Sequence, residues 1–212
     1  MNEKTQSQLL IATSNPAKLA EIREILSDIP ITCVSLKDMG ITHVVEETGS
    51  TFEENAIKKA KEYAKLSNLP TLADDGGLEI DALGGAPGVH SHRWVHENKD
   101  STDEELISYT IEKMRGIAKR GAQLRLVLAL ILPDREEVLT SVGVIRGIIA
   151  ETPSTYRREG FPYRSLLYIP ELKKFYNHDE LTPGEHDAYN HRKRALDALK
   201  PKITEYFSHD SI

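Results

Sequence analysis

Three polar clusters in the N-terminal part of the chain contain the side-chain types that phosphate chemistry needs. They are the segments 13–18 (TSNPAK), 46–49 (EETG) and 74–77 (DDGG). Carboxylates hold hard divalent cations such as Mg²⁺, which in turn contact phosphate oxygens, and lysines pair with phosphates directly. Each cluster taken alone also has an ordinary structural explanation. Their order and context along the chain must therefore distinguish a functional site from a structural one.

The first cluster follows a buried strand predicted at residues 8–13 and opens a helix. We expect Asn15 to cap this helix and Pro16 to occupy its first position. Free backbone N–H groups and the positive end of the helix dipole make such a turn an anion site. Lys18 would add a positive charge there, although a solvated surface lysine explains its spacing equally well. The G-x-x-x-x-G-K-[ST] phosphate loop is absent from the sequence.

The third cluster places Asp74 and Asp75 directly after a short buried strand predicted at residues 71–73. Two adjacent carboxylates repel each other, so a metal ion, a lysine or an arginine usually compensates their charge. Gly76 and Gly77 would allow a ligand to approach the backbone closely. A turn rich in Asp and Gly is the competing interpretation.

The second cluster precedes a helix that opens with a capping box at residues 51–54, T-x-x-E. Glu46 and Glu47 are explained as stabilisers of the helix dipole if they are considered alone. Asn55 and Lys59 are four residues apart, so they share one face of this helix. The helix also carries Lys58, Lys61 and Lys65, so most of its lysines are expected to be ordinary solvated ones.

The remaining candidates carry weaker signals. His90, His92 and His96 cluster without helical spacing, and zinc is disfavoured because no cysteine and no H-E-x-x-H motif accompanies them. Cys33 has no obvious base beside it, so a thiol nucleophile is disfavoured. The run 191–194 (HRKR) is predicted within a helix, where an exposed basic run is the simple interpretation. No G-x-S-x-G elbow is present.

The periodicity predicts an α/β fold with strands and helices that alternate early and a hairpin-like strand pair later. The chain has no internal repeat and no low-complexity linker, so we expect a single domain over residues 1–212 with two lobes around a cleft. The predicted strands are residues 8–13, 31–35, 71–73, 124–132 and 138–150. The predicted helices begin at Asn15, Thr51, Thr102 and Thr182, and end before Pro30, near Asn68, near residue 119 and before Pro201.

The overall composition limits the functional class. The formal net charge is −6, which argues against a protein that binds duplex nucleic acid. No apolar run approaches the roughly 18–20 residues of a membrane helix, so no membrane partner is expected. The first residues lack a basic segment followed by a long apolar one, and Cys33 is the single cysteine. We therefore expect a cytoplasmic protein without an internal disulfide.

The clusters and their neighbours resemble the inosine triphosphate pyrophosphatase family, whose members remove non-standard purine nucleotides. The order and spacing of four blocks agree over residues 9–93, and weaker similarity continues to the C-terminus. The four blocks are Thr13-x-Asn15-x-x-Lys18, Glu47-Thr48-Gly49-x-Thr51-Phe52-x-Glu54-Asn55-Ala56, Ala73-Asp74-Asp75-x-Gly77-Leu78 and Leu83-Gly84-Gly85-Ala86-Pro87-Gly88.

The resemblance implies an elongated mixed β-sheet with flanking helices and a deep substrate cleft between two lobes. It also implies Mg²⁺-dependent hydrolysis of a nucleoside triphosphate to the monophosphate and pyrophosphate by a homodimer. Asp75 matches the catalytic acid, Glu47 a metal-side carboxylate and Lys59 a triphosphate-binding lysine. Mg²⁺ held by Glu47 and Asp75 would activate a water, and the lysines would stabilise the charge that develops as the bond breaks. The substrate-binding residues implied are Thr13, Ser14, Asn15, Lys18, Gly76, Phe161, Tyr163, Arg164, His186, His191 and Arg192.

The chain departs from the family pattern mainly where the base is bound. Gly76 replaces the serine of the D-D-S-G run, which removes a hydroxyl. Arg164 replaces an aspartate, which turns an acceptor into a donor and reverses the charge. His186 aligns with a lysine and Asn190 with a serine, while His191 and Arg192 would still present donors to a purine 6-keto oxygen.

These departures keep two further hypotheses open. One is a nucleotide-binding sensor with little turnover, against which the intact Glu47, Lys59 and Asp75 argue. The other is the same hydrolysis on a different base. A site built around one hydrogen-bonding pattern rejects others, since unpaired buried groups destabilise the complex. We therefore expect altered base selectivity or weaker activity than is usual in the family.

Overall fold

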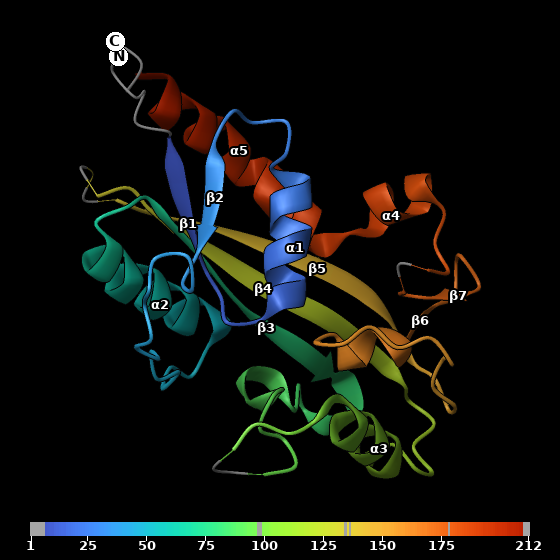
Figure 1. Cartoon of the computed structure of the whole chain (residues 1–212). Helices are drawn as coiled ribbons and strands as arrows, with labels where there is room; N and C mark the ends of the chain where they lie inside the picture. Colours follow the sequence, from blue (N-terminus) through green and yellow to red (C-terminus); the bar gives the residue numbers. More distant parts are fainter. Residues whose placement is uncertain (1–6, 97–98, 134, 136, 178, 210–212) are drawn as a thin grey trace. The chain divides into compact units, whose positions relative to one another are not determined.

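The computed structural model describes residues 7–96, 99–133, 135, 137–177 and 179–209. These residues form one seven-stranded sheet with the strand order β2-β1-β3-β4-β5-β6-β7, together with five α-helices (Figure 1). The strands are β1 (Gln8–Ala12), β2 (Thr32–Ser35), β3 (Thr71–Ile80), β4 (Gly121–Ile131), β5 (Val138–Ile149), β6 (Leu167–Ile169) and β7 (Lys174–Phe175). The helices are α1 (Pro16–Ile25), α2 (Phe52–Ser67), α3 (Asp103–Lys113), α4 (Pro183–Tyr189) and α5 (His191–His209).

The sheet is mixed, which confirms the predicted class. β1 pairs in parallel with both β2 and β3, with Ala12 opposite Ala73. β6 pairs antiparallel with β5 and with β7. Because β1 and β3 run in the same direction, the residues that follow Ala12 and Ala73 lie at the same edge of the sheet, which is where ligands bind in open α/β sheets.

The described chain divides into two compact units. Unit 1 comprises Met1–Asp75, Val127–Val142 and Arg192–Ile212, and unit 2 comprises Gly76–Leu126 and Gly143–His191. In unit 1, helix α5 passes beside the connection between α1 and β2, where Lys200 Nζ lies 2.9 Å from Asp28 Oδ1 (Figure 1). Its buried apolar residues include Leu9, Leu10, Ile11, Ile22, Leu26, Phe52, Ala56, Ala60, Leu72, Leu128, Leu130, Leu196 and Ile203.

Unit 2 has its own hydrophobic core, built from β3 beyond the acidic pair, α3, β4, β5 and the segment 162–181. Trp94 packs against this core and meets Tyr109 edge to face, with ring centroids 5.3 Å apart. The core residues are Leu78, Ile80, Leu106, Ile107, Met114, Ala122, Leu124, Ile145, Ile149, Tyr163, Leu166, Leu167, Ile169, Tyr176 and Leu181.

The helix starts follow the capping residues that the sequence indicated. The Asn15 side chain accepts from the Ala17 and Lys18 N–H groups, and Pro16 is the first residue of α1. Thr102 and Thr182 each form a complete capping box. The box predicted at Thr51 is only half formed: Thr51 accepts from the Glu54 N–H, whereas the Glu54 carboxylate accepts from Ser50 instead.

Three predicted elements differ from the structure. The Asp-Asp-Gly-Gly run at 74–77 lies inside the ten-residue strand β3, not in a turn after a short strand. The predicted helix from Thr182 to Pro201 is two helices that break at Asn190, so His191 begins α5 rather than lying mid-helix. Helix α5 continues through Pro201, and α3 ends at Lys113, before the predicted boundary at 119.

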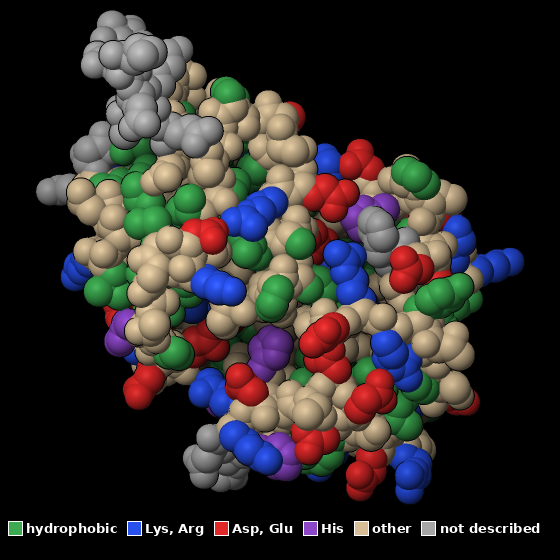
Figure 2. Space-filling view, viewed as in Figure 1, with side chains coloured by type: hydrophobic (Ala, Val, Ile, Leu, Met, Phe, Trp, Pro, Cys, Tyr) green, Lys and Arg blue, Asp and Glu red, His purple; other side chains and the backbone are tan. Residues whose placement is uncertain are grey.

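Within the described residues, no helix is long and apolar enough to cross a membrane. On the face drawn in Figure 2, acidic and basic side chains of the described residues are interspersed and form no continuous basic stripe.

Candidate functional site

Lys59, on helix α2, is the centre of a partly buried cluster in unit 1. Its Nζ lies 2.5 Å from Glu47 Oε1 and 3.6 Å from Asp75 Oδ1, and it donates to the Asp74 carbonyl oxygen at 2.6 Å. Burial acts to lower the pKa of Lys59, but the charges of Asp75, Glu47 and Asp74 outweigh it and raise that pKa. Lys59 is therefore a fixed cation among carboxylates.

Glu47 belongs to the loop that precedes α2, and two contacts hold this loop against the helix. The Gly49 N–H donates to Asn55 Oδ1 at 2.7 Å, and Lys58 Nζ donates to the Glu46 carbonyl oxygen at 2.7 Å. The Glu47 side chain is 30% exposed, more than the other charged groups of the cluster. It can therefore exchange its lysine for a ligand that enters from solvent.

Asp75 is almost fully buried, and this position sets its proton affinity. Burial raises the pKa of the carboxyl group; the Lys59 charge acts against this rise, and the Glu47 charge adds to it. Among the described residues, no hydrogen-bond partner meets Asp75 Oδ2. A carboxylate with a raised pKa and a free oxygen is suited to accept a proton from water.

Asp74 points to the other side of β3 and binds two cations. Its Oδ2 lies 3.2 Å from Lys18 Nζ and 3.0 Å from Arg192 Nη2, and Arg192 Nη1 lies 2.6 Å from Glu21 Oε2. Although burial acts to raise it, the charges of Lys18 and Arg192 hold the pKa of Asp74 well below its ordinary value. Lys18 is thus held by a buried carboxylate at the start of α1.

The turn between β1 and α1 has the geometry that its sequence predicted. Thr13 Oγ1 accepts from the Asn15 N–H at 3.1 Å, and Asn15 Oδ1 accepts from the Ala17 and Lys18 N–H groups at 2.9 and 3.2 Å. Ser14, between them, is exposed. The turn therefore presents the Ser14 side chain to solvent, four residues before Lys18.

The residues expected to contact the base lie mostly in unit 2, in and after a 3₁₀ turn at Pro162–Ser165. The Arg164 guanidinium is buried and lies 3.9 Å from the Phe161 ring centroid and 5.1 Å from that of Tyr176. The Tyr176 hydroxyl meets His191 Nδ1 at 2.9 Å. Cation–π contacts of this kind stabilise a desolvated guanidinium, so Arg164 is part of an aromatic cluster.

Three other residues of unit 2 were predicted to bind the substrate, and the structure shows how each is packed or hydrogen-bonded. The Tyr163 hydroxyl donates to the Ser91 carbonyl oxygen at 2.6 Å, and burial raises its pKa. His186 is half-buried on α4. Gly76 lies so close to β4 that a Cβ atom would be 2.5 Å from the Arg125 carbonyl oxygen. Gly76 therefore holds a close strand contact.

Sequence reasoning missed Glu21. Its carboxylate is only 2% exposed and binds Arg192, which is 171 positions away along the chain. Glu21 lies on α1, where an acidic residue is expected to face solvent. The only signal in the sequence was its place beside Ile22 on the helix, and that does not distinguish a buried carboxylate from an exposed one.

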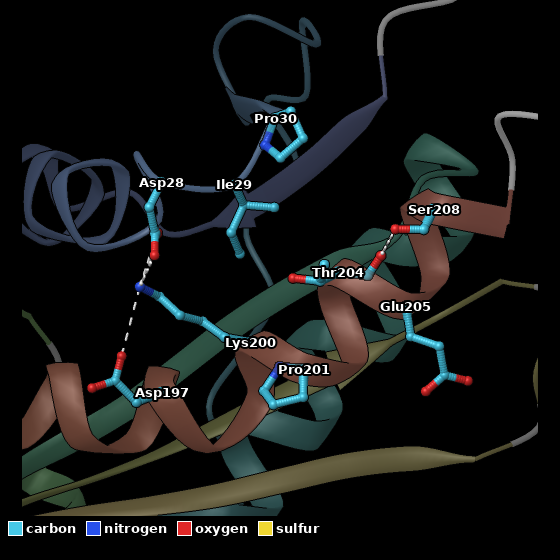
Figure 3. A pocket seen from close by; sticks show the side chains of 9 residues that line it. All are labelled: Asp28, Ile29, Pro30, Asp197, Lys200, Pro201, Thr204, Glu205 and Ser208. Carbon is cyan, nitrogen blue, oxygen red and sulfur yellow. Dashed lines mark hydrogen bonds and ion pairs between the residues drawn. The ribbon is translucent and has the colours of Figure 1, made fainter.

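A hollow of about 520 Å³ also lies in unit 1, between the segment after α1 and the surface of α5 (Figure 3). Lys200 in this hollow is paired with Asp28 at 2.9 Å and with Asp197 at 3.6 Å. Its charge is therefore already compensated, and the hollow contains none of the predicted site residues. It is lined by Asp28, Ile29, Pro30, Asp197, Lys200, Pro201, Thr204, Glu205 and Ser208.

Comparisons with known proteins agree over almost the whole chain. A family model described as the Ham1 family matches residues 9–202. A Bacillus subtilis (strain 168) protein named dITP/XTP pyrophosphatase is 43% identical over 195 residues, which cover 91% of this chain and 94% of the relative. A Clostridium perfringens (strain 13 / Type A) protein of the same name is 36% identical, over 92% of this chain and 97% of the relative.

A solved structure has the same fold. The structure described as a HAM1 protein from Coxiella burnetii superposes with a TM-score of 0.80 at 37% sequence identity. The match covers 93% of this chain and 98% of that chain. Sequence and structure therefore point to one family.

Proposed function

This chain belongs to the Ham1 family, and from this premise we propose that it hydrolyses nucleoside triphosphates of the inosine and xanthosine type to the monophosphate and pyrophosphate. Relatives that are 43% and 36% identical bear the name dITP/XTP pyrophosphatase. The observation that carries the proposal is the cluster in unit 1. There Glu47, Lys59 and Asp75 meet within 3.6 Å of the Lys59 ammonium.

In the proposed mechanism, residues of this chain accept the proton of the attacking water and stabilise the negative charge on the phosphates. Water attacks the α-phosphorus, the bond to the bridging oxygen breaks, and pyrophosphate leaves with the bond electrons. Asp75 Oδ2 takes the proton from the water, which its raised pKa favours. Lys59 and Lys18 stabilise the charge that develops on the phosphate oxygens.

The donor set is compatible with the Mg²⁺ that the family resemblance implies. Glu47 and Asp75 are both carboxylates, and one buried oxygen of Asp75 meets no hydrogen-bond partner among the described residues. Two carboxylates match a Mg²⁺ ion that keeps water and phosphate oxygens as its other ligands. When bound, the ion would neutralise phosphate charge and lower the pKa of water.

We propose that Arg164 changes the base selectivity of this chain. A guanidinium donates hydrogen bonds and accepts none, so a base edge that itself donates is disfavoured beside it. Phe161 and Tyr176 hold the guanidinium on their ring faces. The neighbouring His191 would contact the 6-keto oxygen, and His186 the same end of the base.

The domain organisation, the oligomeric state and the cellular compartment are proposed from the same resemblance. We propose that residues 1–212 act as one catalytic domain, and the match over residues 9–202 supports this because it includes residues of both units. We also propose a homodimer in the cytoplasm. The single cysteine is consistent with a reducing compartment.

A panel of triphosphates with detection of released pyrophosphate tests the proposal. Inosine, xanthosine, deoxyinosine and the four standard triphosphates would be compared at equal concentration with Mg²⁺. We expect turnover of at least one non-standard purine triphosphate well above that of the standard ones. Tight triphosphate binding without pyrophosphate release would instead identify a sensor, and an ordinary inosine and xanthosine preference would refute the role given to Arg164.

A further inference from the structure

We propose that Asn55 is a positioning residue that holds the Glu47 loop and the Asp75 strand at a fixed spacing, independently of the ion pairs that Lys59 makes. The inference rests on the proposed function, because Glu47 and Asp75 are the carboxylates assigned to the metal side of the reaction. Asn55 has no charge and lies on the buried face of α2, with 1% of its surface exposed.

One end of the Asn55 amide is attached to the loop. Its Oδ1 accepts from the Gly49 N–H at 2.7 Å, two residues after Glu47. A Cβ atom on Gly49 would lie 2.7 Å from that same oxygen and 2.7 Å from Glu54 Cβ. The absence of a side chain at Gly49 is therefore what lets the loop reach the amide.

The other end of the amide faces the strand. Lys59, four residues after Asn55 on the same face of α2, has its ammonium 3.6 Å from Asp75 Oδ1, so this face of the helix is turned toward the strand. Burial, the largest influence, raises the pKa of Asp75, and hydrogen bonding from Asn55 acts to lower it, which agrees with this placement. Among the described residues, Asn55 Nδ2 and Asp75 Oδ2 are both buried, and neither has a partner at full hydrogen-bonding geometry. A buried donor and a buried acceptor in this arrangement are satisfied when they close on each other or share a water.

Lys59, one helical turn after Asn55, also links the loop that carries Glu47 to the strand that carries Asp75. It contacts Glu47 and Asp75 through its ammonium group, whereas Asn55 contacts the loop through its amide oxygen and is proposed to face the strand with its amide nitrogen. Residues four apart on a helix share one face, so α2 presents a neutral and a cationic bridge side by side. The two bridges differ in what a triphosphate does to them.

The triphosphate competes only for the cationic bridge. Phosphate oxygens attract the Lys59 ammonium away from its carboxylates, so the ionic link between the loop and the strand weakens as the substrate binds. The neutral amide attracts phosphate oxygens less strongly than the ammonium does, and its Oδ1 is already engaged by the Gly49 N–H. Asn55 therefore keeps the carboxylates in place at the moment when Lys59 is engaged elsewhere.

The test compares Asn55→Ala and Asn55→Asp with Lys61→Ala, an exposed residue of the same helix that serves as control. Asn55→Asp keeps the acceptor for the Gly49 N–H and removes the donor toward Asp75. We expect kcat on inosine triphosphate to fall about 10–100-fold in both Asn55 variants, as is typical when a residue that orients a ligand is lost. The KM for the triphosphate should change by less than about threefold, since the role assigned to Asn55 is to position the carboxylates and not to bind the phosphates.

A purely structural role would give a different pattern. It would lower the thermal midpoint and the folded fraction while leaving kcat per folded molecule at the wild-type value. If Asn55→Ala does not fold, Asn55→Asp, which has nearly the same shape, decides the question together with Gly49→Ala. Gly49→Ala strains the same contact from the loop side. Wild-type kcat per folded molecule in Asn55→Asp would overturn the proposal.

A binding measurement separates this inference from the proposed function. The shift in thermal midpoint on adding limiting MgCl₂ with saturating inorganic pyrophosphate needs no turnover. We expect this shift to shrink in the Asn55 variants, because displaced carboxylates hold the metal less tightly, and to be unchanged in Lys61→Ala. The KM for the triphosphate is measured with Mg²⁺ in excess, where this loss of metal affinity does not enter. If the wild-type chain binds these ligands but hydrolyses no triphosphate, the proposed function fails and this measurement alone decides the role of Asn55. Equal shifts in wild type and Asn55→Asp would then refute it.

Discussion

Replacing Gly76 with serine would restore the residue that the family usually has, and the structure predicts that this change destabilises the protein. The Cβ atom would lie 2.5 Å from the Arg125 carbonyl oxygen and 2.6 Å from Leu126 Cβ, whereas ordinary contacts begin at 3.4 Å. The added atom must therefore gain about 0.9 Å (3.4 − 2.5 Å) against the backbone of β4. A backbone atom cannot give way by a rotamer change.

Overpacking of this kind typically destabilises by about 1–3 kcal/mol. For a chain of this size, each kcal/mol corresponds to roughly 2–4 °C in the melting temperature. Gly76→Ser should therefore lower the melting temperature by about 2–12 °C, and denaturant unfolding should show the same loss of free energy. Since the hydroxyl must displace β4, we expect no gain in turnover.

Gly184→Ser is the matched control for this prediction. Gly184 lies at the start of α4, and a Cβ atom there would meet nothing within 4 Å. Its free energy of unfolding should stay within about 0.5 kcal/mol of the wild type, as for most surface changes. A Gly76→Ser variant as stable as Gly184→Ser would refute the close strand contact.

Three further predictions concern buried charges and a helix start. Glu21→Gln removes one of the two carboxylates that pair with the buried Arg192 guanidinium and leaves Asp74 as the other, so the free energy of unfolding in urea titrations should fall by at most about 3–5 kcal/mol; a loss under 1 kcal/mol would contradict the buried pairing. Because the folded pKa of Asp74 is depressed, its ionised form stabilises the fold above the ordinary aspartate pKa, and this contribution is lost as the pH falls through the depressed value. The stability difference between wild type and Asp74→Asn should therefore stay constant above about pH 4 and shrink as the pH is lowered from about 4 toward 2, and a constant difference over this lower range would show that the charge of Asp74 is irrelevant. Thr102→Ala removes an acceptor of a complete capping box and should lower the free energy of unfolding by about 0.5–2 kcal/mol in the same titration; an unchanged value would mean that water replaces the cap.

Local signals predicted the parts of the fold that depend on a few neighbouring residues. Asn15 with Pro16, and Thr102 with Glu105, start helices because a side-chain oxygen satisfies the free N–H groups of the first turn. The buried strand near Leu10 and the strand at 124–132 followed from apolar runs. These interactions are complete within four or five residues, so the sequence alone contains them.

Long-range pairing decided the elements that the sequence did not predict. Asp74 and Asp75 favour turns locally. They nevertheless lie inside strand β3, because the start of this strand pairs with β1 and the strand continues past them. The partner of Arg192 lies on α1, far away along the chain, so no spacing rule could identify Glu21. Tertiary contacts thus overrode local preference at the functional site itself.

The proposed catalytic cluster was predictable as a set of residues but not as an arrangement. The order of Glu47, Lys59 and Asp75 along the chain indicated their shared chemistry. Their ion pairs, and the way Asp74 turns toward Lys18 instead, depend on which face of β3 each side chain occupies. That alternation follows from the strand conformation, which the sequence had suggested to be a turn.

The most direct test of the central claim follows the oxygen of water into the products. Inosine triphosphate would be hydrolysed in ¹⁸O-labelled water with Mg²⁺, and the products examined by ³¹P NMR for the wild type and for Asp75→Asn. The account predicts inosine monophosphate carrying one ¹⁸O atom, unlabelled pyrophosphate, and a rate about 10²–10⁴-fold lower in Asp75→Asn. Label in pyrophosphate, release of orthophosphate, or an Asp75→Asn rate equal to that of the wild type would contradict it.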